Sequence, residues 1–194
     1  GNTFAGEVET AGSTVKKFKA GDQVFGYTGE TMGAYAEYLC IPEDGIIDAK
    51  PSHLTYEEAS VVPYGATMAL CLLRKVNIQT DWKVLVIGAS GAIGSAAVQL
   101  AAHHFGAEVT GVCSTQGIEY VKSLGAVRVI DYKKDDFAKS GESYDLIIDI
   151  LGKGSFSGYR GSLRQKGIYM PVSFKTGKLL QMLCTSVSGG KRVI

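Results

Sequence analysis

Residues 83–94 read Lys-Val-Leu-Val-Ile-Gly-Ala-Ser-Gly-Ala-Ile-Gly, and this stretch decides the fold. The apolar run Val84–Ile87 is typical of a strand that a parallel sheet buries on both faces. Glycines follow at three-residue intervals, and an alanine-rich helix over about 92–105 ends at Gly106, before a second strand over 108–113. In such a strand–turn–helix–strand unit the glycines let the backbone approach a pyrophosphate, whose charge the helix N-terminus stabilises.

The remainder of the C-terminal part continues this alternation. The pattern predicts strands at 127–130, 145–150, 167–172 and 191–194, with helices at 116–124 and 135–139. Strands and helices that alternate at these lengths predict an α/β fold, a doubly wound parallel sheet of the Rossmann type with right-handed crossovers.

The N-terminal part has a different character. Short glycine-punctuated segments at 4–12, 22–26 and 33–42 predict strands, with a turn at Gly21-Asp22. They form an incomplete β-domain with too little core to stand alone. The composition changes near residue 50, so we predict domains at 1–50 and 51–194.

The first helix after this boundary carries its own start signal. Thr55 is a predicted N-cap with acidic residues in the following turn. Pro63 and Gly65 predict an interruption, after which Ala66–Lys75 is helical.

Composition excludes several classes of protein. The net charge is +1 and no basic patch is visible, which argues against a nucleic-acid partner. No run of 18 apolar residues and no signal peptide occur, so we expect a cytoplasmic protein without a membrane partner. The cysteines (Cys40, Cys71, Cys113, Cys184) and histidines (His53, His103, His104) lack zinc-ligand spacing, which favours buried free thiols.

Four stretches together resemble a known family. They are Phe4–Val8 with Phe18–Gly26, Gly33–Tyr38, Val84–Gly94 with Ala96–Ala101, and Val121–Ala126 leading to Ile130-Asp131-Tyr132. The chain resembles the zinc-independent quinone oxidoreductase (zeta-crystallin-like) branch of the medium-chain dehydrogenase/reductase superfamily.

The resemblance implies a fold and a truncation. In the family, a GroES-like β-domain is formed by both ends of the chain, and a Rossmann domain is inserted between them. Compared with that plan, this chain resembles a fragment with a partial GroES-like domain and a truncated last Rossmann strand. We expect the fragment itself to be inactive, and the full-length protein to be a homodimer.

The resemblance also separates zinc-dependent from zinc-free members. Zinc members carry Gly-His-Glu where this chain has Gly1-Asn2-Thr3, and the four-cysteine structural zinc lobe is absent. An amide does not replace imidazole as a zinc ligand. We therefore predict no metal site.

The cofactor turn aligns with Gly-x-Gly-x-x-Gly over residues 89–94, with Ala89 in the first glycine position. The glycine that meets the pyrophosphate, Gly91, is retained. We predict that Ser90, Gly91, Ala92 and Ile93 bind the cofactor, with the amides of Ala92 and Ile93 as phosphate donors.

The end of the second strand bears on the choice of cofactor. NAD enzymes place an acidic residue there for the ribose 2′-OH, whereas this chain has Ser114, Thr115 and Gln116. The resemblance adds Tyr132 to the predicted cofactor site. This chain has Gln116 at a position where relatives often have a lysine. We predict NADPH as the cofactor, with NADH less favoured.

The remaining site residues come from the resemblance and from strand ends. The resemblance places Thr67 near the nicotinamide and Asn2 near its reactive face, while Leu151 and Gly152 follow the strand 145–150 at the cofactor edge. Tyr64 either donates a proton or packs. No catalytic residue is assigned, because hydride transfer needs orientation more than a dedicated acid.

The predicted function is NADPH-dependent hydride transfer to a small molecule, a quinone or an activated alkene (enone), without zinc. One alternative is a relative of zinc alcohol dehydrogenases that lost its metal; another is a non-catalytic, crystallin-like NADPH-binding protein. A short-chain dehydrogenase is disfavoured because no lysine stands four residues after Tyr159 or Tyr169.

Overall fold

The computed structural model describes residues 1–172, 182, 185 and 190–194 of the chain. These residues form two compact units, Gly1–Met68 and Ala69–Ile194, and the boundary in the chain falls inside the helix Tyr56–Arg74. The predicted boundary at residue 50 stays a prediction.

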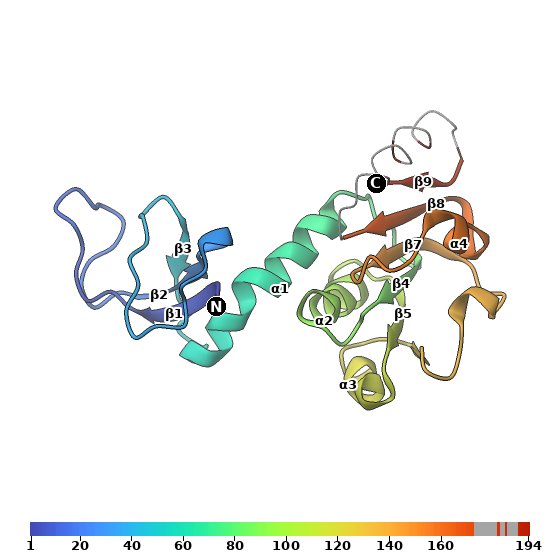
Figure 1. The fold of residues 1–194 in the computed structure, drawn as a ribbon, viewed down its shortest axis with the longest axis horizontal. Helices are drawn as coiled ribbons and strands as arrows, with labels where there is room; N and C mark the ends of the chain where they lie inside the picture. Colours follow the sequence, from blue (N-terminus) through green and yellow to red (C-terminus); the bar gives the residue numbers. More distant parts are fainter. Residues whose placement is uncertain (173–181, 183–184, 186–189) are drawn as a thin grey trace. The chain divides into compact units, whose positions relative to one another are not determined.

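A six-stranded parallel sheet forms the centre of the second unit. In chain order its strands are β4 (Lys83–Ile87), β5 (Glu108–Cys113), β6 (Arg128–Asp131), β7 (Tyr144–Asp149), β8 (Leu163–Pro171) and β9 (Arg192–Val193). Across the sheet they follow the order β6-β5-β4-β7-β8-β9, and all of them except β6 are labelled in Figure 1. This order confirms the predicted doubly wound sheet, because the chain leaves β4 toward one side and later returns to its other side at β7.

Both faces of this sheet are buried, as the continuous apolar strands predict. Successive side chains of a strand point to opposite faces. Val84 and Val86 accordingly belong to one apolar cluster with Leu146 and Ile148, while Leu85 and Ile87 belong to the other. Burial on both faces keeps the strand ends in fixed positions.

The helices of this unit are shorter than predicted. The helix α2 (Ala92–Gln99) continues as a π-helical turn, Leu100–His104, before the predicted stop at Gly106. After β5 come a 3-10 turn (Thr115–Gly117) and α3 (Ile118–Ser123), and α4 is Phe156–Tyr159. Further 3-10 turns lie at Gly29–Thr31, Phe137–Lys139 and Arg160–Ser162.

The strand predicted at 167–172 begins earlier, at Leu163. Tyr144 of β7 is paired with Leu163, but Leu146 is paired with Ile168, so β8 carries extra residues there. Lys166, which lies among these extra residues, has a φ of 65°, the left-handed backbone conformation that occurs in such irregular stretches of a strand.

The first unit holds a small antiparallel sheet of three strands, β1 (Thr3–Glu7), β2 (Gln23–Tyr27) and β3 (Ile46–Ala49), in that order. The predicted strand at 33–42 is wrong. Its alternation is real, but β2 is paired with β1 on one side and β3 on the other, so this segment joins neither ladder. Tyr35 is 95% exposed, as expected where alternation has no buried face.

The helix α1 (Tyr56–Arg74) runs without the predicted interruption. Its start is a capping box: the Glu58 amide donates to the Thr55 hydroxyl, and the Thr55 amide donates to the Glu58 carboxylate. Pro63 lies inside the helix and is buried together with Gly65.

The thiols differ in exposure. Cys113 is buried as predicted, whereas Cys40 and Cys71 are exposed, and Cys184 lies outside the described residues. Burial, then the nearby Asp131 carboxylate, raises the pKa of the Cys113 thiol. Within the described part of the chain, no helix is both long and apolar enough to cross a membrane.

Candidate cofactor site

The parallel sheet brings most of the predicted site residues to one edge. Parallel strands end on the same side, so the loops after β4, β5, β6 and β7 share that edge. Ten predicted residues lie in these loops or at their helix starts: Ser90, Gly91, Ala92, Ile93, Ser114, Thr115, Gln116, Tyr132, Leu151 and Gly152. The reversal of strand order between β4 and β7 lies among them.

The turn after β4 is built around close approach of the helix to the strand. A Cβ atom on Gly94 would lie 2.1 Å from the Gly88 carbonyl oxygen, so only glycine fits there. A Cβ atom on Gly91 would contact only that same oxygen, at 3.5 Å, and Gly91 is exposed. Gly94 thus holds helix against strand, and Gly91 leaves the outer side of the turn open. Ala89, in the first glycine position, is fully buried.

This open turn fits a pyrophosphate. The first α-helical hydrogen bond of α2 is donated by the Ser95 amide to the Gly91 carbonyl, at 2.8 Å. The amides of Ala92 and Ile93 precede it, and a helix leaves such first-turn amides without an intrahelical acceptor. The side chain of Ile93 is buried, so the backbone amide is what this residue offers a ligand. Phosphate oxygens match these donors and the positive end of the helix dipole.

The turn after β5 packs directly against the glycine turn. A Cβ atom on Gly117 would lie 3.0 Å from the Cβ of Ser90 and 3.2 Å from the sulfur of Cys113. The structure therefore brings the segment Ser114–Gly117 beside Ser90. Thr115, Gln116 and Tyr132 are exposed on this side.

An acidic residue that the sequence analysis left unassigned lies in the same corner. The Thr115 hydroxyl donates to the Asp131 carboxylate at 2.5 Å, and the Lys133 amide donates to the other oxygen at 3.0 Å. These two hydrogen bonds, led by that from Thr115, lower the pKa of Asp131 below its ordinary value. Asp131 is therefore an anion at neutral pH, next to the predicted 2′-phosphate position.

The loop after β7 contacts the glycine turn from the other side. A Cβ atom on Gly88 would lie 3.2 Å from the Leu151 side chain and 3.4 Å from that of Ile150. Leu151 is 50% exposed, whereas Gly152 is buried and its amide donates to the Asp149 carboxylate.

The other predicted residues belong to the first unit. The Asn2 carbonyl accepts a hydrogen bond from the Thr28 amide at 2.7 Å, beside Tyr27 at the end of β2. The rings of Tyr27 and Tyr64 are 5.8 Å apart, so Tyr64 of α1 lies near this strand end. Thr67 follows three residues later in α1 and is exposed. The packing role of Tyr64 is therefore observed, and its proton-donor role stays a hypothesis.

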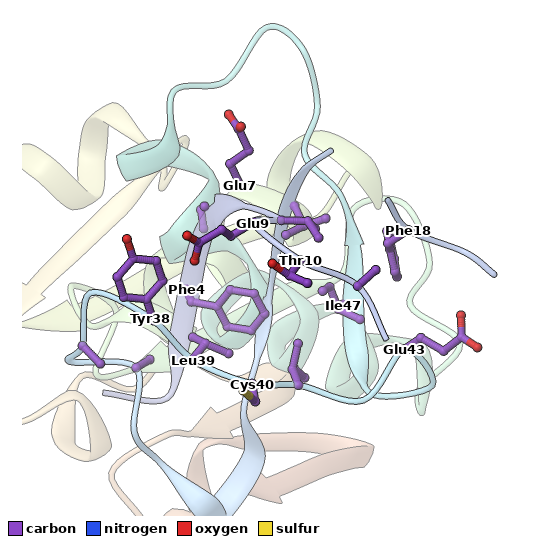
Figure 2. Close-up of a pocket in the computed structure, with 18 of the residues that line it drawn as sticks. Phe4, Glu7, Glu9, Thr10, Phe18, Tyr38, Leu39, Cys40, Glu43 and Ile47 are labelled. Atoms are coloured by element: carbon purple, nitrogen blue, oxygen red, sulfur yellow. The ribbon is translucent and has the colours of Figure 1, made fainter. Parts of the chain in front are cut away.

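The same unit contains a cavity of about 770 Å³. Figure 2 shows Phe4, Leu39 and Ile47 among its apolar lining residues, and Glu7, Glu9 and Glu43 among its acidic ones. Glu43 accepts hydrogen bonds from the amides of Lys16 and Lys17, which lower the pKa of its carboxyl group. None of Asn2, Tyr64 and Thr67 lines this cavity.

Among the described residues, no three His, Cys, Asp or Glu side chains are grouped so that they could hold a metal ion. The zinc-free chemistry stays a prediction. Sequence reasoning missed Asp131 and Asp149, although each is the last residue of its strand. An acidic residue that ends a buried parallel strand is a signal for this edge of the sheet.

The strand order and the glycine turn define the fold class, a doubly wound α/β protein of the Rossmann type. Two family models match: an alcohol dehydrogenase GroES-like domain over residues 1–51, and a zinc-binding dehydrogenase domain over residues 92–187.

Solved structures agree over the whole chain. A quinone oxidoreductase from Coxiella burnetii matches with a TM-score of 0.85 and 28% identity, over 100% of this chain and 62% of that chain. The Escherichia coli quinone oxidoreductase, solved in complex with NADPH, matches with a TM-score of 0.81 and 25% identity, over 100% and 62%.

A curated relative, the tomato 2-methylene-furan-3-one reductase, is 36% identical over 162 residues, which are 79% of this chain and 42% of that protein. The chain spans about half the length of the curated relatives it matches. It belongs to the quinone oxidoreductase family of the medium-chain dehydrogenases/reductases.

Proposed function

We propose that this chain binds NADPH along the carboxyl edge of its parallel sheet and serves hydride transfer to a quinone or an activated alkene, without zinc. The observation that carries the proposal is the glycine turn at the reversal of strand order, open at Gly91 and followed by the start of α2. Relatives named as quinone oxidoreductases and as a furanone reductase support this substrate class.

Different residues at the carboxyl edge of the sheet would bind different parts of NADPH. The amides of Ala92 and Ile93 would hold the pyrophosphate, and the segment Ser114–Gln116 with Tyr132 would surround the 2′-phosphate. Since the Thr115 hydroxyl proton is donated to Asp131, Ser114 and Tyr132 are the better-placed hydroxyl donors. Leu151 and Gly152 would lie on the β7 side, toward the nicotinamide half.

NADPH, when bound, supplies a hydride, and reduction of a quinone or enone also consumes one proton. The chain's own residues would orient the cofactor along the edge. Asn2 and Thr67 remain proposed contacts of the nicotinamide, as the resemblance implies, and Tyr64 or solvent would be the proton source. We also propose that the full-length protein is a homodimer with a cytoplasmic location.

A binding titration tests the proposal. NADPH fluorescence should be quenched or shifted in a saturable way when the purified chain is added, and the same titration with NADH should give weaker binding. Added zinc should change neither curve. Absence of binding, tighter binding of NADH, or a zinc-dependent curve would each contradict the corresponding part of the proposal.

A further inference from the structure

Asp149 is a fully buried acidic residue that the proposed chemistry leaves unused. It ends β7, next to Ile87 of β4, and so lies where the strand order reverses. Its carboxylate accepts three hydrogen bonds, from the Gly152 amide at 2.9 Å, the Gly154 amide at 3.1 Å and the Tyr169 hydroxyl at 2.9 Å. A buried carboxylate costs a great deal of free energy unless it is satisfied in this way.

These hydrogen bonds fix the position of one loop, Leu151–Gly154. Two of the donors are backbone amides of the segment Leu151–Gly154, and the third is a side chain of β8. The backbone of Asp149 and Ile150 adds two bonds to neighbouring strands: the Ile150 amide donates to the Ile87 carbonyl, and the Val172 amide donates to the Asp149 carbonyl. The start of the loop is therefore anchored on both sides of β7.

The far end of the loop is held from its other side by an aromatic ring. A Cβ atom on Gly154 would lie 2.0–2.3 Å from the Tyr159 ring and hydroxyl, so the ring occupies the space that any side chain at position 154 would need. Tyr159 in turn packs on Tyr169 with ring centroids 5.7 Å apart. Burial, followed by the charge of Asp149, raises the pKa of both tyrosine hydroxyls, which keeps them protonated.

We infer that Asp149 is a positioning residue: through the Gly152 and Gly154 amides it fixes the loop Leu151–Gly154 against Gly88, in the conformation that receives the nicotinamide half of the cofactor. The link to the cofactor rests on the proposed function, whereas the fixing of the loop does not. The side chains of Leu151 and Ile150 lie within 3.2–3.4 Å of the place where a Cβ atom on Gly88 would project, so the loop lies beside the glycine turn.

The two halves of the cofactor distinguish this role from general stabilisation. In a doubly wound sheet, the adenosine half lies on the side of the second strand, here β5, and the other half lies across the reversal point, on the β7 side. Loss of the Asp149 anchor should weaken binding of NADPH, whereas 2′,5′-ADP, which carries only the adenosine half, should bind as before. A merely destabilised fold would weaken both.

The test compares Asp149→Asn with Asp145→Asn, an identical change in the same strand. Asp145 lies at the opposite end of β7, where it accepts hydrogen bonds from the Lys83 amide and the Arg164 guanidinium and does not contact the loop. In Asp149→Asn, hydrogen exchange at the Gly152 and Gly154 amides should accelerate about tenfold or more, and the NADPH dissociation constant should rise about tenfold. Neither quantity should change in Asp145→Asn.

A milder variant covers the case in which Asp149→Asn does not fold. Tyr169→Phe removes one of the three donors and keeps the ring, so it should accelerate exchange at both amides by a smaller factor. Unchanged exchange in the folded variants would overturn the fixing of the loop. Faster exchange with unchanged NADPH affinity, or equal weakening of NADPH and 2′,5′-ADP, would overturn the positioning role. If the unmodified chain bound neither compound, the proposed function would fail, and exchange alone would still decide the fixing of the loop.

Discussion

The hydroxyl of Thr115 donates to the carboxylate of Asp131 at 2.5 Å, which joins the turn after β5 to the last residue of β6. This contact places a negative charge in the corner where the 2′-phosphate of NADPH would bind. It also uses the one proton that Thr115 has to donate. We therefore expect the choice between NADPH and NADH to depend on this pair of residues, which are 16 positions apart in the chain.

Replacement of Asp131 by asparagine should raise the affinity for NADPH relative to NADH. The change removes a negative charge that would repel the 2′-phosphate of NADPH. The 2′-hydroxyl of NADH is uncharged, so the affinity for NADH gains nothing from the loss of that repulsion. Dissociation constants for both cofactors, measured by fluorescence titration, check this expectation. Asp135→Asn is the control, because Asp135 is exposed in the same turn. Equal effects of the two variants would show that only the net charge matters.

The contribution of this pair to stability should depend on pH. The native pKa of Asp131 lies below its ordinary value, so the ionised carboxylate stabilises the folded state at neutral pH. This stabilisation should be lost as the pH falls below about 4 and through the lower native pKa. Thr115→Val should accordingly melt below the unmodified chain at pH 7, with a difference that shrinks toward acidic pH. A difference that grew on acidification would contradict the assignment.

The two glycines of the cofactor turn should respond differently to alanine. Gly94→Ala forces a methyl group against the Gly88 backbone and should cost about 3 kcal/mol or more of unfolding free energy. Gly91→Ala should leave the melting temperature nearly unchanged but weaken NADPH binding about tenfold, because its methyl group would occupy the pyrophosphate side of the turn. Gly161→Ala, at an exposed position with open space, is the control for both measurements.

Introduction of a lysine at position 116 should strengthen NADPH binding. Gln116 is exposed next to Thr115, and a cation there would attract the 2′-phosphate by about 1 kcal/mol, or roughly fivefold in affinity. The gain should fall as ionic strength rises, since exposed charges are screened. The NADH dissociation constant, measured in parallel, should stay constant; a matching gain for NADH would place the added charge near the pyrophosphate instead.

Tyr64 offers a test of packing against chemistry. Tyr64→Phe keeps the ring that faces Tyr27 and should leave stability unchanged, whereas Tyr64→Ala should cost about 1 kcal/mol through loss of the ring pair. Thermal unfolding of both variants checks this. Where turnover of a quinone or enone is measurable, a selective fall of kcat in Tyr64→Phe would support the proton-donor role; unchanged kcat would exclude it.

Local patterns predicted the elements that carry the cofactor turn. Apolar runs predicted strands at 84–87 and 108–113, and the structure has both within a residue or two. The glycine spacing predicted the turn that follows the first of them. The N-cap at Thr55 was equally visible, because a capping box involves only residues three apart. Where alternation had no ladder partner, at 33–42, the same kind of reasoning failed.

The sequence by itself determined the doubly wound class of this protein, because strand and helix periods and glycine spacing are properties of neighbouring residues. Which distant groups bind the two acidic residues at the strand ends, Asp131 and Asp149, was visible only in the tertiary structure. The Thr115 hydroxyl reaches Asp131 from the turn after β5, the Tyr169 hydroxyl reaches Asp149 from β8, and α1 continues through the buried Pro63. Such contacts depend on which segments are adjacent in space, and a local pattern carries no information about that.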